Sequence, residues 1–221
     1  MIKGWVGSMF VALMIATSVK SSLADWYIIP TGSMEPTILV GDRVFTNKLA
    51  YDLKIPYTRL RVATWENPKR GDIVVFNSPV DGTRLIKRVV GIPGDIISMQ
   101  SNRLTINGHD LKYNDYDNEE LLSSVSDKES RYRMYIEDLT GIEHKTMVMP
   151  FRNPLDSFKP ILVPDDRYLV MGDNRDNSVD SRYFGFIRRK LILGQATAVV
   201  ISLDLNNYYK PRWSRFFSEL L

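Results

Sequence analysis

Cysteine is absent from the 221-residue sequence, and histidine occurs only twice, at His109 and His144. Without thiols the chain has no disulfide, no thiolate zinc site and no cysteine nucleophile. Two histidines leave few ways to build a histidine-based metal site or a Ser-His-Asp triad. We therefore expect no metal and no cofactor, so any nucleophilic chemistry has to use other side chains.

A large excess of charge is also missing, because 29 Lys and Arg residues face 26 Asp and Glu residues, which gives a net charge of +3. Nucleic-acid binding normally needs a strongly basic face, so the sequence predicts no nucleic-acid partner. A small positive excess fits a protein at a membrane surface. The hydrophobic share of 44% and the charged share of 25% are typical of a folded globular protein and exclude wholesale disorder.

One long uncharged stretch lies at the amino terminus, where residues 4–19 (GWVGSMFVALMIATSV) carry no charge. A helix that crosses a bilayer needs roughly 20 residues, with about 17 as the lower end, so this stretch is marginal. Trp5, Trp26 and Tyr27 are of the kind found at the two lipid headgroup levels. We interpret residues 1–24 as a membrane anchor, a transmembrane helix.

The same stretch has a second interpretation, a cleavable signal peptide. Lys3 would supply its basic start, and Ser22 and Ala24 would be the small residues three and one positions before a cut. The sequence leaves both interpretations open.

Helical periodicity is almost absent after residue 25, where short β-type runs alternate with turns that carry Gly or Pro. Asn107 and Gly108 predict a hairpin turn within residues 103–112. We therefore expect a mainly β fold, an antiparallel barrel or sandwich-like core. The predicted strands are residues 27–29, 43–46, 73–76, 85–90, 96–99, 104–106, 168–171 and 196–202.

Composition divides the rest of the chain. Residues 113–163 are polar, acid-rich near their start and weakly periodic, so we expect an inserted subdomain there. It separates the two halves of the β core, residues 25–112 and 164–205. A basic and aromatic tail follows at residues 206–221, and it can either rest on a membrane surface or pack on the domain.

Residues 28–38 (IIPTGSMEPTI) place a serine at a sharp exit from a predicted strand. Gly32 permits a tight turn with free backbone amides, and Ser33 follows it. Such a serine can present its hydroxyl outward, while an amide of the same turn points at a developing oxyanion. The alternative is a helix N-cap, in which Ser33 only starts a short turn.

In residues 84–90 (RLIKRVV), strand alternation puts Lys87 on one face and Arg88 on the other, each with apolar neighbours. At least one of the two cations is therefore expected among apolar groups, where a lysine loses its proton more readily. To act as a base near neutral pH, its pKa has to fall by about 3 units from roughly 10.4, which is worth about 4 kcal/mol. The alternative is a solvated lysine on an edge strand.

Residues 168–185 (YLVMGDNRDNSVDSRYFG) run from a predicted strand into a polar loop. A calcium loop that starts at Asp173 would put Arg175 at a ligand position, and a start at the next aspartate fails as well, so calcium binding is excluded. The composition predicts a buried network of ion pairs and hydrogen bonds, with Asp180 and Arg182 close enough to pair. An ordinary polar turn is the alternative.

Taken together, these segments resemble the type I signal peptidases, a family of membrane-bound serine peptidases. The likeness keeps the family's order of motifs and covers most of residues 26–100 and 164–203, and the segment 113–163 carries little of it. The matching segments are PTGSMEPT at 30–37, GD at 41–42, KRGDIVVF at 69–76, IKRVVGIPGD at 86–95 and GDNRDNSVDSRYFG at 172–185.

The resemblance implies a catalytic Ser/Lys dyad. Ser33 would attack the scissile carbonyl, and a neutral Lys87 would take its proton and later pass it to the leaving amine. Ser178 would orient the lysine through a hydrogen bond. Thr31 and the Ser33 amide would form the oxyanion hole, although other members carry serine at the position of Thr31.

The resemblance also implies how a substrate binds. Asp180 and Arg182 match a structural ion pair near the site, and the substrate would add a strand between residues 27–30 and 83–86. Shallow apolar pockets would accept small side chains, as in Ala-x-Ala. Their lining would be Ile29, Met34, Ile38, Leu85 and Ile86.

The implied function is removal of N-terminal signal peptides from exported preproteins. The implied location is the cell membrane, crossed once, with the catalytic domain on the outer side. The expected partners are thus signal peptides of preproteins and a lipid bilayer. A membrane-tethered β-domain that binds peptides without cutting them is the alternative. A penicillin-recognising enzyme is excluded, because no Ser-x-x-Lys occurs in the chain.

Overall fold

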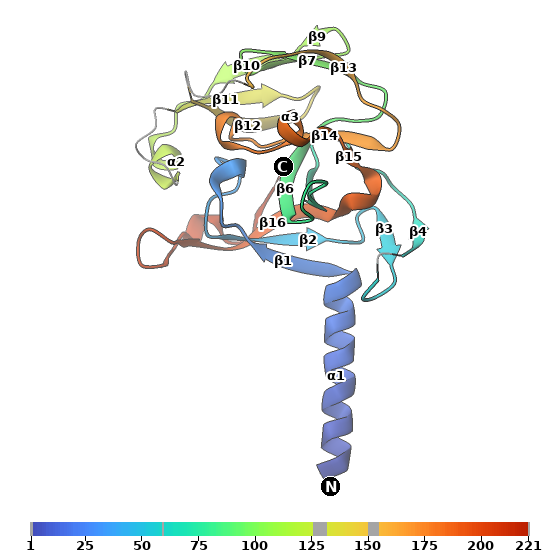
Figure 1. The fold of residues 1–221 in the computed structure, drawn as a ribbon. Coiled ribbons are helices and arrows are strands. Elements are labelled where there is room, and N and C mark those ends of the chain that lie inside the picture. The colour runs from blue at the N-terminus through green and yellow to red at the C-terminus, as the bar shows by residue number, and fades with distance from the viewer. Residues whose placement is uncertain (1, 59, 126–131, 150–154, 221) are drawn as a thin grey trace.

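The computed structural model describes residues 2–58, 60–125, 132–149 and 155–220. A single long helix, α1 (Ile2–Ser22), projects from a body built mainly of antiparallel β-strands (Figure 1). The prediction of a mainly β fold is confirmed, and each of the eight predicted strand segments overlaps a strand. The remaining helices are short. They are α2 (Glu119–Ser124), α3 (Ser181–Phe184) and the 3-10 turns η1 (Gly32–Met34), η2 (Arg175–Asn177), η3 (Arg189–Leu191) and η4 (Trp213–Arg215).

The largest sheet forms a half-barrel in the strand order β1-β2-β16-β5-β6-β14-β15, and β17 and β18 also pair with β16. Strand β5 has a continuous apolar sequence because both of its faces are covered. Ile73 and Val75 pack in one cluster, whereas Val74 and Phe76 pack in another. The strands are β1 (Ala24–Ile28), β2 (Asp42–Asn47), β5 (Ile73–Asn77), β6 (Arg84–Gly91), β14 (Arg167–Met171), β15 (Ile187–Arg188), β16 (Ile192–Asp204), β17 (Lys210–Pro211) and β18 (Ser218–Glu219).

Smaller sheets lie at the end of the body away from α1 (Figure 1). One has the order β13-β7-β8-β9 and the other β10-β11-β12. The hairpin predicted at Asn107 and Gly108 is present, with φ of 52° and 80° at these residues and with Thr105 paired to Asp110. The strands are β7 (Ile96–Gln100), β8 (Arg103–Ile106), β9 (His109–Asp110), β10 (Lys112–Asp115), β11 (Arg133–Asp138), β12 (Glu143–Val148) and β13 (Phe158–Leu162).

The predicted insertion, residues 113–163, contributes strands to both small sheets. Strands β11 and β12 belong to the three-stranded sheet, whereas β13 pairs with β7, which precedes the segment in sequence. A shared apolar cluster that includes Val90, Leu104 and Leu169 packs the four-stranded sheet onto the half-barrel, and Leu139, which follows β11, belongs to the same cluster. The segment is therefore packed into the body through common strand pairs and a common core.

The predicted transmembrane helix is not supported, because no helix among the described residues is both long and apolar enough to cross a membrane. The helix α1 does carry exposed apolar side chains, with Met9 72%, Phe10 63% and Leu13 60% exposed. Beside its base, β3 (Asp52–Lys54) and β4 (Arg61–Thr64) form a separate two-stranded hairpin.

The carboxyl-terminal tail packs on the domain, which was one of the two alternatives. Its strands β17 and β18 pair with β16. Arg215 Nη2 donates to Asp42 Oδ2 at 2.6 Å and to the Thr37 carbonyl at 2.9 Å. Trp213 and Phe217 nevertheless remain exposed, so the packed tail still presents aromatic rings to the surroundings.

Candidate active site

Ser33 lies inside η1, the tight turn that follows β1, and only 9% of it is exposed. Glu35 N donates to Gly32 O at 3.1 Å, which closes the turn. Asn174 holds it from the loop after β14, since its backbone N donates to Ser33 O at 3.2 Å and its Nδ2 to Gly32 O at 3.1 Å. The N-cap position belongs to Thr31, so Ser33 does not serve as the helix cap.

Lys87 lies on β6 opposite Val74 of β5, and it is only 3% exposed. Its Nζ donates to Ser33 Oγ at 2.6 Å. Burial lowers the pKa of Lys87 from 10.5 to about 8, although the carboxylates of Asp180 and Asp173 act in the opposite direction. The structure thus brings together a serine hydroxyl and a lysine that gives up its proton within about one pH unit of neutrality.

This pair has the geometry of a nucleophile and its base. A neutral amine accepts the hydroxyl proton at the same distance at which the ammonium now donates. With a pKa of about 8, roughly a tenth of the Lys87 side chains are neutral at pH 7 and half are neutral at pH 8. The resulting ammonium can then protonate a leaving group.

Ser178 is buried next to this pair but does not bond to it. A Cβ placed on Gly172 would overlap both Ser178 Oγ and the carbonyl of Ser33, so the three residues are in close contact. The Ser178 hydroxyl helps to lower the pKa of Asp180, yet it has no hydrogen-bond partner of normal geometry among the described residues. The expected hydrogen bond from Ser178 to Lys87 is therefore not formed in this structure.

Asp180 and Arg182 form an ion pair with an Nη2–Oδ2 distance of 2.8 Å. Asp180 Oδ2 also accepts from Gly172 N at 3.0 Å, and its Oδ1 accepts from Arg182 N at 3.2 Å, where it caps α3. Burial raises the pKa of Asp180, but the hydrogen bonds and charge of Arg182, together with the hydrogen bonds of Gly172 and Ser178, lower it overall. The pair thereby fixes the backbone that carries Gly172 and Ser178.

Thr31 is exposed and has extended backbone angles, φ −130° and ψ 150°. Its side chain makes no capping hydrogen bond to η1. Thr31 is thus on the exposed side of the turn that carries Ser33. A hydroxyl of Thr31 and the backbone amide of Ser33 can face one ligand atom from such positions.

Four of the five predicted pocket residues pack together. Ile29, Met34 and Ile38 belong to one buried cluster, and the partly buried Ile86 packs against it. Leu85 packs against a different cluster, because adjacent residues of a strand point to opposite faces of the sheet. The structure therefore does not bring Leu85 to the other four.

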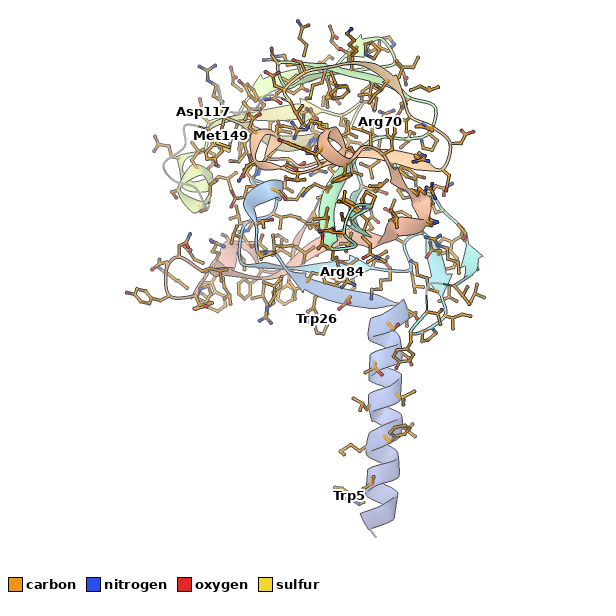
Figure 2. All side chains as sticks on the ribbon, in the orientation of Figure 1. Trp5, Trp26, Arg70, Arg84, Asp117 and Met149 are labelled. Carbon is orange, nitrogen blue, oxygen red and sulfur yellow. The ribbon has the colours of Figure 1, made fainter. Side chains whose placement is uncertain are left out.

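Two strand edges face each other beside Ser33. Among the described residues, β1 pairs only with β2, and β14 pairs with β6 only from Arg88 onward, so no described strand pairs with the first half of β6 on that side. Arg84 marks the place where the edges approach, with its guanidinium 4.7 Å from the centroid of the Tyr27 ring (Figure 2). This opening leaves backbone groups available to an added strand.

A buried charged network, most of which the sequence analysis missed, lies behind the site. Arg88 forms an ion pair with Asp173 at 2.8 Å, and Arg175 forms one with Glu137 at 2.7 Å. His144 lies between them, 3.4 Å from Glu137 and 3.8 Å from Asp173. Burial lowers the pKa of His144 to about 4, so the ring is neutral at pH 7.

Only part of this network had a signal in the sequence. The alternation of residues 84–90 put Lys87 or Arg88 among apolar groups, and a buried network was predicted for the loop that contains Asp173 and Arg175, although only Asp180 and Arg182 were named as a pair. Glu137 and His144 come from the weakly periodic segment, where nothing in the pattern marks them as buried.

Among the residues that the structure describes, no cluster of His, Asp and Glu is arranged to hold a metal ion.

Comparison with known proteins places the chain in a family. The sequence profile described as "Signal peptidase, peptidase S26" matches residues 2–201. Signal peptidase I of Pseudomonas fluorescens is 37% identical over 210 residues, which cover 88% of this chain and 71% of that protein. Signal peptidase I P of Bacillus subtilis subsp. natto is 35% identical over 201 residues, which cover 90% of this chain and 89% of that protein.

A crystal structure of a signal peptidase I from Enterococcus faecalis V583 covers 61% of this chain and 100% of its own, with 28% identity and a TM-score of 0.38. The profile match and the two relatives each extend over most of the chain, and they confirm the resemblance seen in the motifs. This protein belongs to the signal peptidase family, peptidase S26.

Proposed function

We propose that this protein is a serine endopeptidase that removes N-terminal signal peptides from exported preproteins, with Ser33 as nucleophile and Lys87 as general base. One observation carries the assignment of the dyad. The Nζ of a buried lysine lies 2.6 Å from a serine Oγ in a turn of the main chain. Membership of the signal peptidase family supports the substrate class.

In the proposed reaction, neutral Lys87 takes the proton of Ser33 as Oγ attacks the scissile carbonyl. The ammonium then donates that proton to the leaving amine, and an acyl ester on Ser33 remains. Lys87, neutral again, activates a water that hydrolyses the ester. The Ser33 amide and the Thr31 hydroxyl are the proposed donors to the oxyanion. Ser178 is the proposed positioning residue, and it has to rotate to reach Lys87.

The substrate is proposed to bind as a strand in the opening between β1 and β6. Its backbone would hydrogen-bond to the two edges, and alternate side chains would point into the body. Ile29 and Ile86 lie where such side chains would enter, and the fully buried Met34 and Ile38 form the floor beneath them. A shallow apolar floor favours small residues, which fits cleavage after Ala-x-Ala.

The experiment is cleavage of a preprotein by the detergent-solubilised protein, with the cut mapped by mass spectrometry. Ser33→Ala and Lys87→Ala should each lower kcat by about 10³-fold or more, whereas Lys159→Ala, at an exposed lysine of β13, should have no effect.

For the wild type, kcat/KM should rise about tenfold per pH unit and level off above pH 8, because Lys87 must lose its proton. A Lys87→Ala variant with wild-type cleavage would overturn the dyad. Binding without any cut would favour the peptide-binding alternative.

We also propose that α1 attaches the domain to a lipid bilayer of the cell membrane. Among the described residues, the apolar side chains of Met9, Phe10 and Leu13 are mostly exposed, which is typical of a surface that another apolar phase covers. Trp26 projects from β1 on the side of the body from which α1 extends (Figure 2). Attachment at this side would hold the body close to membrane-tethered substrates.

A further inference from the structure

A basic cavity of about 560 Å³ lies where α1 meets the body, and Arg84, at the edge of the proposed substrate opening, forms part of its wall. Thr17 and Ser21 of α1 line one wall. The other walls carry five cationic side chains and one carboxylate, that of Asp25. The cations are Lys48, Lys54, Arg61, Arg84 and Lys190.

Among the described residues, the carboxylates that form ion pairs with these cations are fewer than the cations. Asp52 lies behind the wall, and Lys54, Arg61 and Arg189 all bond to it, at 2.6, 2.8 and 2.9 Å. Asp25 bonds to Lys48 at 3.2 Å. Burial lowers the pKa of Lys54 in spite of Asp52, and the charges of Arg61 and Arg189 add to this effect. The cavity therefore has an excess of positive charge and suits an anion.

A second cavity of about 510 Å³ shares Lys54 with the first but is almost entirely apolar. Phe10, Val11 and Met14 of α1 form one side of it. Leu53, Ile55 and Val62 of the β3–β4 hairpin form the other. An apolar groove that opens beside a basic cavity has the two surfaces that an amphiphile requires.

The loop of the β3–β4 hairpin forms hydrogen bonds with the part of α1 that lines the basic cavity. Tyr57 N donates to Ser21 Oγ at 2.8 Å, and the Tyr57 hydroxyl bonds to Thr17 Oγ1 at 2.5 Å. Phe10 and Ser21 are eleven residues apart, or about 17 Å along the helix axis. The basic cavity is thus at the end of α1 next to the body, and the apolar groove extends toward the amino terminus.

We propose that the two cavities form one binding site for an anionic phospholipid, with the phosphate in the basic cavity and an acyl chain in the apolar groove. The site rests on the proposed attachment of α1 to a bilayer. If α1 enters the lipid, Thr17 and Ser21 lie at the headgroup level, and Phe10 and Val11 lie at the depth of the acyl chains. The order of the two cavities along the helix matches the order of the two parts of a lipid.

The test uses the full-length protein and vesicles of phosphatidylcholine with or without phosphatidylglycerol. Phosphatidylglycerol should tighten binding, and Lys190→Glu should reduce that gain by about tenfold or more. Lys159→Glu makes the same change of charge at the far end of the body. It should reduce the gain in binding from phosphatidylglycerol much less than Lys190→Glu does. In the groove, Val62→Asp should weaken binding to the anionic vesicles, whereas Val80→Asp, also at an exposed valine, should not.

Equal losses in Lys190→Glu and Lys159→Glu would show a diffuse electrostatic attraction and overturn the site. Complete competition by inorganic phosphate would assign the basic cavity to a free anion and also overturn it. Failure of the wild type to bind either kind of vesicle would instead contradict the attachment of α1. Cleavage of a soluble peptide should stay unchanged in Lys190→Glu, which separates this site from the proposed catalytic one.

Discussion

Burial lowers the pKa of Lys87 from 10.5 to about 8, and the same burial destabilises the fold. The unfolded chain binds the lysine proton more tightly than the folded chain does. The difference of about 2.5 pKa units is worth about 3 kcal/mol. This destabilisation is fully present below pH 8 and disappears as the pH rises toward 10.5.

We therefore expect Lys87→Met to raise the Tm at pH 7 by about 5 °C while it abolishes cleavage. Methionine fills a similar volume without a charge, and the loss of the hydrogen bond to Ser33 offsets part of the gain. Thermal unfolding of both proteins from pH 7 to 10.5 measures the effect, and the gap should narrow above pH 8. A gap that is independent of pH would contradict the assigned pKa.

At the residue scale, the sequence motifs predicted more of the candidate site than composition and net charge did. The pairing of Ser33 with Lys87 followed from family motifs, because no local pattern relates two residues 54 positions apart. Alternation alone could not tell which of Lys87 and Arg88 is buried, and the structure buries both. The orientation of Ser178 depends on tertiary packing against Gly172, which no local pattern contains.

At the element scale, neighbouring residues of β6 pack against different apolar clusters. Its alternation sends Ile86 to the cluster of Ile29 and Met34, and Leu85 to the cluster of Phe76. The first cluster underlies the proposed substrate strand, and the second underlies the rest of the sheet. Under the proposed function, the two neighbours therefore have different roles although both are large aliphatic residues.

Ile86→Ala should enlarge the proposed pocket, so larger residues at the cleavage site should gain at least about tenfold in kcat/KM relative to alanine. Leu85→Ala should leave that ratio unchanged, although it also removes a partly buried side chain. The measurement is competitive cleavage of two peptides that differ only in the residue before the cut. Equal relaxation of specificity in both variants would mean that Leu85 also lines the pocket.

The spacing of apolar residues and the positions of turn residues were sufficient to predict β2, β5, β7, β8 and the hairpin at Asn107. Each of these strands buries at least one face, and burial is what leaves a regular apolar pattern in the sequence. Strands β11, β12 and β13 were not predicted. In β11 and β12 the buried residues Glu137 and His144 contact Arg175 and Asp173, which lie far away in sequence. Glu137 shows the difficulty, since it is buried in β11 yet would look like a surface residue in any local window. The helix α1 was expected from its apolar run, but its role as a transmembrane segment was not supported.

At the scale of the whole molecule, buried charges connect the half-barrel to the three-stranded sheet. Arg88 belongs to β6, and its partner Asp173 follows β14. Glu137 belongs to β11 of the small sheet, and its partner Arg175 belongs to η2. His144 of β12 lies between the two carboxylates. The loop that carries Asp173 and Arg175 therefore bonds to both parts of the body.

This arrangement predicts that Asp173→Ala destabilises the protein by about 3–5 kcal/mol, because it leaves the guanidinium of Arg88 buried without its main counter-charge. The matched control is Glu66→Ala, which breaks the exposed Lys69–Glu66 ion pair and should not change the Tm measurably. Urea unfolding measures the loss, and fluorescence of Tyr and Trp reports both parts of the body.

If the network joins the two parts, wild type and Asp173→Ala should each unfold in one transition, with the variant at lower urea. Two separate transitions in the variant would show that the remaining Arg175–Glu137 pair and the apolar contacts do not suffice to couple the small sheet to the half-barrel. A change no larger than that of Glu66→Ala would mean that Arg88 finds another partner. The first outcome follows from the geometry, since Asp173 accepts both the Nε and Nη2 groups of Arg88, at 2.9 and 2.8 Å.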